Sequence, residues 1–490
     1  MAALGLFGCA PAPSGSVPTP SATSAGTTAA SPSPTSSPLA TIVVPQAAVV
    51  RHRADQVVEP LGGAIPTIRL LSPGVDAGEP TIGILADGRI AFQGWDRPPE
   101  KAPGTATIAI IDPSSGSSSV VLAPGSLPSH DPYLWVDPTT NRIFTSHLQV
   151  PGELDPTLFC VVTKFSDDAG ATWSDSARRC QATPEDQPRI ITGKPISSET
   201  KGYPNVVYLC FQDDEAERGH LCARSLDGGL TFDSPTAEAF PYDGRCNSSF
   251  GQPAIGPDGS LWLVTAGCRT ARVAVSRDEA RTWQVLEVGG PDTNGEGESG
   301  VAVDGDGVVY VVWTAVDRLP RLVVSRDRGA TWGAPMNVAA PDVKEANIAT
   351  LAVGGPGNVA IGYVGSLDAP GGLQDPGSAA CQFQPCPDLT GWAHATWHAW
   401  LTVTENALDA SPLFTSAVLN DPASPIVRGN CGPGRCKALA DFLDVAIDAA
   451  GQPMLAFVAC PDGMCPPTSL RGAWATAPGV VGMLEGIDLR

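Results

Sequence analysis

Seven carboxylate or amide side chains recur at one position of a repeated pattern, directly before a stretch that alternates apolar and polar residues around a turn. Carboxylates and amides are the oxygen donors that a hard cation such as Ca²⁺ prefers, and they also suit the hydroxyls of a neutral glycan. If the fold brings the starts of these stretches together, the side chains form a ligand-binding funnel. The alternative is a rim that binds water or its own members and only positions the strands. The seven residues are Glu79, Asp131, Gln187, Gln252, Glu298, Asn347 and Asp441.

Each of these residues begins a unit with the signature of a β-hairpin. In the unit from Gln252 through Ala266, for example, period-two alternation runs on both sides of the turn Gly256-Pro257-Asp258-Gly259. Such alternation buries one face of each strand, and a Gly-containing turn reverses the chain. With Gly 53 and Pro 48, the composition also favours many short strands.

A second repeat follows several of these hairpins. Four octapeptides share the pattern Ser-x-Asp-x-(Gly/Ala)-x-Thr-aromatic, and their aromatic ends fall 59, 51 and 49 residues apart. The Asp carboxylate can accept hydrogen bonds from turn N–H groups, the Ser and Thr hydroxyls lock the hairpin ends, and the aromatic ring packs on the next sheet. These roles are structural rather than chemical. The Asp and aromatic members are Asp168, Asp227, Asp278, Asp327, Trp173, Phe232, Trp283 and Trp332.

Together the two repeats predict an all-β chain that folds as a β-propeller of four-stranded blades. The first hairpin of each unit supplies the inner two strands of a blade, and the octapeptide hairpin supplies the outer two. Closure into a ring protects the strand edges. We count about seven units, and six blades with an extra hairpin is the alternative. Residues 366–396, rich in Gly, Pro, Asp and Cys, predict an inserted loop.

The 13 cysteines indicate an oxidising compartment. Three pairs flank predicted turns symmetrically, so that their members face each other across a hairpin within bridging reach. A fourth pair is local in sequence. The cysteines at 431, 436, 460 and 465 can pair in three ways, and zinc binding is the alternative for them. The four predicted disulfides are Cys160–Cys180, Cys210–Cys222, Cys246–Cys268 and Cys381–Cys386.

Cys9 is the thirteenth cysteine and has no predicted disulfide partner, and the sequence around it accounts for this. The run Leu4-Gly5-Leu6-Phe7-Gly8-Cys9 resembles the lipobox of bacterial lipoproteins, in which the signal is cut before a Cys that becomes lipidated. The tract that follows is nearly all Pro, Ser, Thr, Ala and Gly, a composition typical of a flexible tether. We therefore expect a signal over 1–9, a tether over 10–45 and the propeller over 46–490, in an exported protein that is lipid-anchored to the outer face of the cell membrane.

The net charge limits the classes of molecule that the protein is expected to bind. Asp+Glu 51 against Lys+Arg 30 gives a net charge of −21, which repels phosphate and makes nucleic acid a poor partner. No stretch of 18 or more apolar residues is present, so the sequence predicts no membrane-spanning helix. The lipid anchor is the only membrane contact expected, and we expect a monomer.

The octapeptides resemble the Asp boxes of BNR-repeat propellers, which include the sialidases, and the resemblance covers roughly 79–480. The segment 435–448 is also similar to bacterial proteins described as sialidase-family. A sialidase site implies an arginine triad for the substrate carboxylate, a Tyr nucleophile with a Glu partner, and an Asp acid/base. The family's early Arg-Ile-Pro motif is missing, since Ile68-Arg69-Leu70 lacks the Pro. Arg245, Arg269, Arg321 and Arg428 are arginine candidates, while Tyr203 and Tyr242 are the tyrosine candidates outside apolar strand runs.

The predicted funnel residues are acidic or amide-bearing, so they disfavour a carboxylate sugar. The sequence therefore favours a tethered, non-catalytic propeller that binds a carbohydrate or an extracellular protein. A sialidase-like exo-glycosidase and an envelope scaffold are the alternatives. Ca²⁺ is the one candidate cofactor.

Overall fold

The computed structural model describes residues 48–62, 65–96, 104–122, 128–182, 185–213, 219–241, 251–266, 270–290, 299–369, 395–428, 431–432, 435–436, 443–459 and 477–490. The chain divides into two units, residues 1–37 and 38–490, and the first unit lies outside the described residues. The described part of the second unit consists of strands and turns, without an α-helix. It accordingly contains no helix long and apolar enough to cross a membrane.

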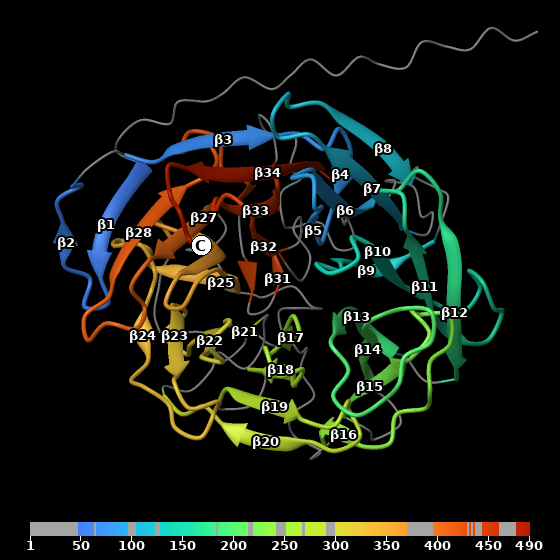
Figure 1. Ribbon diagram of the computed structural model, residues 1–490. Helices are drawn as coiled ribbons and strands as arrows, with labels where there is room; N and C mark the ends of the chain where they lie inside the picture. Colours follow the sequence, from blue (N-terminus) through green and yellow to red (C-terminus); the bar gives the residue numbers. More distant parts are fainter. Residues whose placement is uncertain are drawn as a thin grey trace, which may run out of the picture. The chain divides into compact units, whose positions relative to one another are not determined.

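Seven sheets follow one another around a common axis, and each is a blade of a β-propeller (Figure 1). The propeller therefore has seven blades, as the sequence predicted, and not the six of the alternative. From the innermost strand outward, blade 1 consists of β5 (Thr81–Ile84), β6 (Ile90–Asp96), β7 (Thr105–Ile111) and β8 (Ser118–Leu122). Blade 2 consists of β9 (His130–Val136), β10 (Ile143–Gln149), β11 (Phe159–Ser166) and β12 (Ser174–Gln181). Blade 3 consists of β13 (Glu185–Gly193), β14 (Val206–Asp213), β15 (His220–Ser225) and β16 (Glu238–Phe240).

The next two blades repeat this order. Blade 4 consists of β17 (Ala254–Ile255), β18 (Leu261–Thr265), β19 (Arg272–Ser276) and β20 (Gln284–Glu287). Blade 5 consists of β21 (Gly300–Val303), β22 (Val309–Thr314), β23 (Pro320–Ser325) and β24 (Met336–Asn337). Apolar side chains from facing blades fill the space between the sheets, and the buried Trp262 and Trp313 belong to one such cluster.

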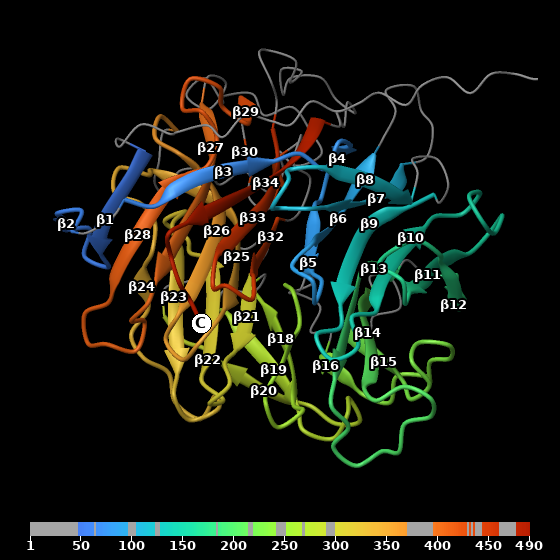
Figure 2. The same cartoon turned by 45° about the horizontal axis from the view of Figure 1, so that its top comes forward.

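Blades 6 and 7 combine strands from both ends of the described chain. Blade 6 consists of β25 (Glu345–Val353), β26 (Val359–Ser366), β27 (Thr396–Thr404) and β28 (Leu413–Val418), extended by β1 (Val49–Arg53) and β2 (Val58–Glu59), with β29 (Val427–Arg428) beside β27. Blade 7 consists of β32 (Asp444–Ile447), β33 (Pro453–Val458), β34 (Ala477–Glu485) and β3 (Thr67–Leu71), and β4 (Asp76–Ala77) also pairs with β34. The ring therefore closes where β3 pairs along β34, as Figure 2 shows.

The four Asp boxes connect the third and fourth strands of blades 2, 3, 4 and 5. In the first, the Asp168 carboxylate accepts hydrogen bonds from the N–H and the hydroxyl of Thr172, while the Ser166 hydroxyl accepts the N–H of Gly170. The indole of Trp173 donates to the Val121 carbonyl of blade 1. The box thus ties its own turn and the neighbouring blade, which is the structural role that its residue types predict.

Blade 6 contains an Asp box that the sequence pattern did not reveal. The Asp368 carboxylate accepts the Ser366 hydroxyl at 2.9 Å, and then the N–H and hydroxyl of Thr396 at 2.7 and 2.8 Å. These are the bonds of an ordinary box, but 370–394, which lie outside the described residues, separate its two halves. This segment falls within the inserted loop predicted for 366–396. The insertion is the reason that a search for a contiguous octapeptide missed the box.

Glu279, in the Asp box of blade 4, links that blade to blade 3. One carboxylate oxygen accepts three backbone N–H groups, from Ile196, Ser197 and Ser198, each at 2.9 Å. The other oxygen accepts the Ser198 hydroxyl and lies 3.0 Å from Arg224 Nη1. We call this arrangement the Glu279 clasp.

Two predicted disulfides are present. Cys160–Cys180 joins β11 to β12 and Cys210–Cys222 joins β14 to β15, and in each case the two cysteines are direct partners in the strand register. Cys431 and Cys436 are backbone partners in a two-stranded sheet of β30 (Cys431–Gly432) and β31 (Arg435–Cys436). The other predicted positions, Cys9, Cys246–Cys268, Cys381–Cys386, Cys460 and Cys465, lie outside the described residues.

Candidate functional site

The predicted funnel positions share an unusual backbone conformation. Glu79, Asp131 and Gln187 each precede a proline and have φ of 49°, 45° and 48°, and the residue after Asn347 has φ of 55°. The strand register shifts at these points in blades 2, 3 and 6. A positive φ is costly for a residue with a side chain, and such strain with a bulge re-aims side chains next to functional sites. Glu298 and Asp441 lie outside the described residues.

Some of these polar groups connect neighbouring blades. Asp131 Oδ2 accepts the N–H of Gln187 at 3.4 Å, across blades 2 and 3. Thr81 Oγ1 accepts the N–H of Leu134 at 3.1 Å, across blades 1 and 2. Asp131 thus forms a hydrogen bond between blades 2 and 3, and its role in ligand binding stays a prediction.

The Gln252 side chain forms hydrogen bonds across the axis. Gln252, directly before the innermost strand of blade 4, donates from Nε2 to Asp444 Oδ1 of blade 7 at 2.7 Å. Asp444 Oδ2 accepts the N–H of Ile82 in blade 1 at 2.8 Å. Asp444 therefore gathers groups from three blades. The sequence did not single out Asp444, because it begins the apolar strand β32, three residues after the predicted Asp441.

Asp444 is buried and retains a proton near neutrality. Burial raises its pKa to about 7, against the opposite effects of the Ile82 N–H, the Gln252 amide and the charge of Arg189. A carboxyl group with this pKa can donate a proton at physiological pH. By this criterion Asp444 is suited to acid catalysis.

Arg189 is the cation of this site. It lies on β13, is 1% exposed, and its guanidinium carbon is 5.0 Å from the centre of the Tyr133 ring on β9. It is the only arginine within the seven innermost strands as the structure describes them. A sialidase triad would need two further arginines from other segments.

The residues implied by the sialidase resemblance do not gather around Arg189 in the described part of the chain. Tyr203 is buried, and its hydroxyl donates to Asp137, in the turn that ends β9 at the opposite end from Asp131. Arg321 contacts Asp317 on blade 5. Arg245, Arg269 and Tyr242, and the side chain of Arg428, lie outside the described residues.

Three neutral polar atoms near the axis are buried and have no hydrogen-bond partner in the described structure. They are Gln187 Oε1 in blade 3, Ser299 Oγ directly before the innermost strand of blade 5, and Thr350 Oγ1 in blade 6. Nearly all buried polar atoms in proteins are hydrogen-bonded. Groups from three blades therefore retain unused hydrogen-bonding capacity.

Two further buried groups were not anticipated from sequence. Burial raises the pKa of Glu185, the first residue of β13, to about 7, although Arg179 Nε lies 2.5 Å from its carboxylate. Burial and the charge of Lys164 lower the pKa of His147 to about 3, so this imidazole is neutral at pH 7. Its ring nitrogens bond Ser129 and Thr145 within the protein, a structural arrangement.

Among the described residues, no group of three or more His, Cys, Asp or Glu side chains has the arrangement of a metal site.

No family model and no curated protein matches the chain. Among solved structures, it is similar to an α-L-arabinanase from Penicillium chrysogenum complexed with arabinobiose (14% identity, TM-score 0.41, 61% of this chain and 93% of that one). It is also similar to an intramolecular trans-sialidase from Ruminococcus gnavus (13%, 0.41, 58% and 89%). A protein of unknown function from Dyadobacter fermentans shows 12% identity and a TM-score of 0.43, over 85% of this chain and 99% of that one. These values are too low to assign a ligand or an activity to this chain.

Proposed function

We propose that the propeller binds a neutral, hydroxyl-rich ligand, in the first place a glycan, at the end of the axis where the innermost strands begin. The observation that carries this proposal is the set of buried, unsatisfied atoms Gln187 Oε1, Ser299 Oγ and Thr350 Oγ1, which come from three blades. A sugar hydroxyl both donates and accepts, so it can satisfy a carbonyl oxygen and a hydroxyl alike.

The net charge supports a neutral ligand over an anionic one. The net charge of the whole chain is −21, which opposes the approach of anions. A protein ligand that presents hydroxyl and amide groups meets the same demands, and Ca²⁺ is the candidate cofactor for either ligand.

A second candidate function is exo-glycosidase activity, and Asp444 is the observation that favours it. Glycoside hydrolysis needs a carboxylic acid that is protonated at working pH and can protonate the leaving oxygen. The pKa of Asp444, raised to about 7, meets this requirement.

The experiment is a glycan-array measurement on the purified chain, with and without Ca²⁺, together with an assay for released sugar. Replacing Gln187 or Thr350 by Ala is expected to weaken binding about 3- to 10-fold each, the contribution of one neutral hydrogen bond. Thr331→Ala, in the Asp box of blade 5, is the matched control and leaves affinity unchanged. Equal affinity in all three variants contradicts the proposed site.

Asp444→Asn separates the two functions. If the chain hydrolyses its ligand, this variant abolishes release while binding persists. If wild-type protein binds glycans and releases no sugar, the binding function stands alone. Absence of both binding and release contradicts both candidates and leaves the scaffold role.

We also infer that the protein acts outside the cytoplasm, tethered through Cys9 by the segment 10–45. Two cross-strand disulfides support an oxidising compartment. Metabolic labelling with a radioactive fatty acid tests the anchor, because Cys9→Ser is expected to abolish incorporation.

A further inference from the structure

The two described disulfides have the same strand geometry and different surroundings. Their Cα–Cα separations are 4.1 and 4.0 Å. Cys210 and Cys222 lie on the two middle strands of blade 3 and are 0% and 2% exposed. Cys180 is half-buried on the outer edge strand of blade 2, while its partner Cys160 is fully buried. Cys180 is therefore the one cysteine of the two disulfides that is not fully buried.

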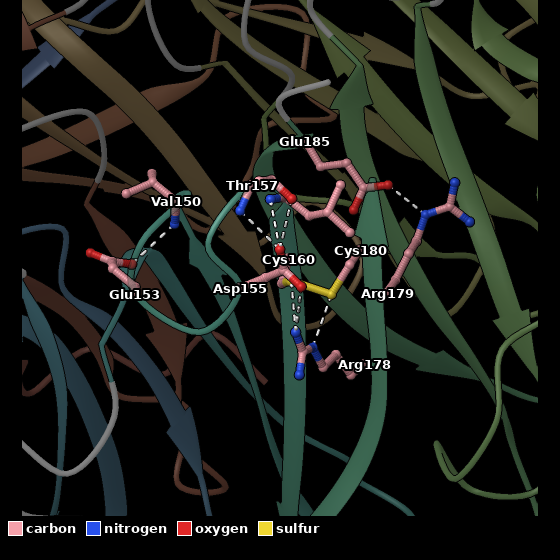
Figure 3. The surroundings of a disulfide bond; sticks show 10 residues. Val150, Glu153, Asp155, Thr157, Cys160, Arg178, Arg179, Cys180 and Glu185 are labelled. Atoms are coloured by element: carbon pink, nitrogen blue, oxygen red, sulfur yellow. Dashed lines mark hydrogen bonds and ion pairs between the residues drawn. A yellow bond between two sulfur atoms is a disulfide. The ribbon is translucent and has the colours of Figure 1, made fainter. Parts of the chain in front are cut away.

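A guanidinium group lies against the more exposed disulfide. Arg178 Nε is 2.9 Å from Cys180 Sγ, and Arg178 Nη2 is 3.4 Å from Cys160 Sγ (Figure 3). A disulfide sulfur is a weak acceptor, but a thiolate is an anion and gains far more from an adjacent cation. Arg178 therefore stabilises the thiolate that forms when this disulfide opens.

Arg178 also contacts a carboxylate. Asp155 Oδ2 lies 3.8 Å from Arg178 Nη2, so its charge opposes a nearby thiolate. Asp155 Oδ1 is already bound by the N–H groups of Thr157 and Leu158. The guanidinium group is closer to each sulfur than to the carboxylate. The net effect of this arrangement is therefore to favour the thiolate.

We propose that Cys160–Cys180 is a thiol–disulfide exchange site for an external dithiol, whereas Cys210–Cys222 is a structural disulfide. A thiolate of the dithiol attacks Cys180 Sγ, the sulfur–sulfur bond to Cys160 breaks, and Cys160 leaves as a thiolate beside Arg178. The second thiol of the reagent then displaces Cys180 from the mixed disulfide. The dithiol is oxidised to its own disulfide, and the protein gains two electrons and two protons as two thiols.

Opening this disulfide removes the covalent cross-link between β11 and β12, which leaves β12 held to blade 2 by the Asp-box turn and its strand pairing with β11. The next residue, Arg179, forms the ion pair with Glu185 at the start of β13. That pair connects the edge strand β12 to the innermost strand of blade 3. The proposal rests on the sulfur environment alone and does not depend on the proposed ligand-binding function.

The test uses the full oxidised chain and dithiothreitol as the dithiol. Samples are taken at intervals, free thiols are alkylated, and peptide mass mapping reports each cysteine separately. Cys160 and Cys180 are expected to label at least about tenfold faster than Cys210 and Cys222, because a buried disulfide reacts only after local opening. Equal rates, or faster labelling of Cys210 and Cys222, overturn the proposal.

Two variants distinguish the effect of the Arg178 charge on the reaction rate from the effect of solvent exposure. Arg178→Gln is expected to slow the opening of Cys160–Cys180 about fivefold, the effect of losing a unit charge about 4 Å away in a water-accessible site. Arg178→Lys keeps the charge and retains most of the wild-type rate. An unchanged rate in Arg178→Gln shows that exposure alone governs the reaction and overturns the role of Arg178. Circular dichroism and the unchanged rate of Cys210–Cys222 in both variants establish that the fold is intact.

Discussion

Replacing Glu279 by Gln is expected to weaken the contact between blades 3 and 4. In the Glu279 clasp, the carboxylate binds three successive backbone N–H groups and two side chains, with Arg281 Nη2 at 3.5 Å. Glutamine preserves the shape, but it removes the negative charge and turns one acceptor into a donor. The NH₂ group of glutamine then faces N–H or O–H donors, and these donors have no acceptor on that side of the clasp.

The pKa of Glu279 provides the magnitude. Burial alone would raise this pKa, but the hydrogen bonds from Ser198, Ser197 and Ile196 lower it from 4.5 to about 2. A difference of this size corresponds to about 3 kcal/mol of folding free energy. The side chain of Arg281 is 41% exposed, and solvent screening reduces the expected loss to about 2 kcal/mol.

The pH dependence has a definite sign. Because the folded-state pKa lies below the unfolded value, the stabilisation is complete above a pH of about 5 and is lost as the pH falls toward 2. The free-energy difference between wild type and Glu279→Gln is therefore expected to be about half as large at pH 3 as at pH 7.

Urea unfolding followed by tryptophan fluorescence at both pH values measures this difference. Glu199→Gln is the matched control, because Glu199 is exposed in the same loop of blade 3. The reasoning is refuted if Glu279→Gln unfolds at the wild-type urea concentration at pH 7, or if its destabilisation does not depend on pH.

Asp444→Asn is expected to be more stable relative to wild type at pH 8 than at pH 5. Because the folded-state pKa of Asp444 is raised to about 7, the wild-type protein loses folding free energy as the pH rises from about 4 through 7, whereas the asparagine variant does not. Equal urea midpoint shifts at both pH values contradict this. Gly251→Ala is expected to cost about 2–3 kcal/mol, because its Cβ would lie 1.7 Å from the Ser299 carbonyl oxygen of blade 5. Gly305→Ala, with no atom within 4 Å, is the control, and equal unfolding of the two glycine variants refutes the close approach.

The architecture could be predicted because its signals are local. An Asp box needs only eight consecutive residues to satisfy its own turn, and alternation needs only the two strands of a hairpin. Both signals can be recognised in a single sequence, and they predicted the all-β propeller. The hairpins in turn predicted the two cross-strand disulfides that the structure contains. The box at Asp368 was missed because an insertion interrupts that local signal.

The site depends on residues that are distant in sequence. The Gln252–Asp444 bond joins residues 192 apart, and neither local pattern nor composition distinguishes Asp444 from other strand residues. The burial that raises its pKa is likewise a product of seven blades meeting at one axis. The sequence by itself determined how the blades with a contiguous Asp box are built and pinned, because most of those interactions act within one hairpin. Only the tertiary structure decided which polar groups meet at the axis, because ring closure brings together residues from opposite blades.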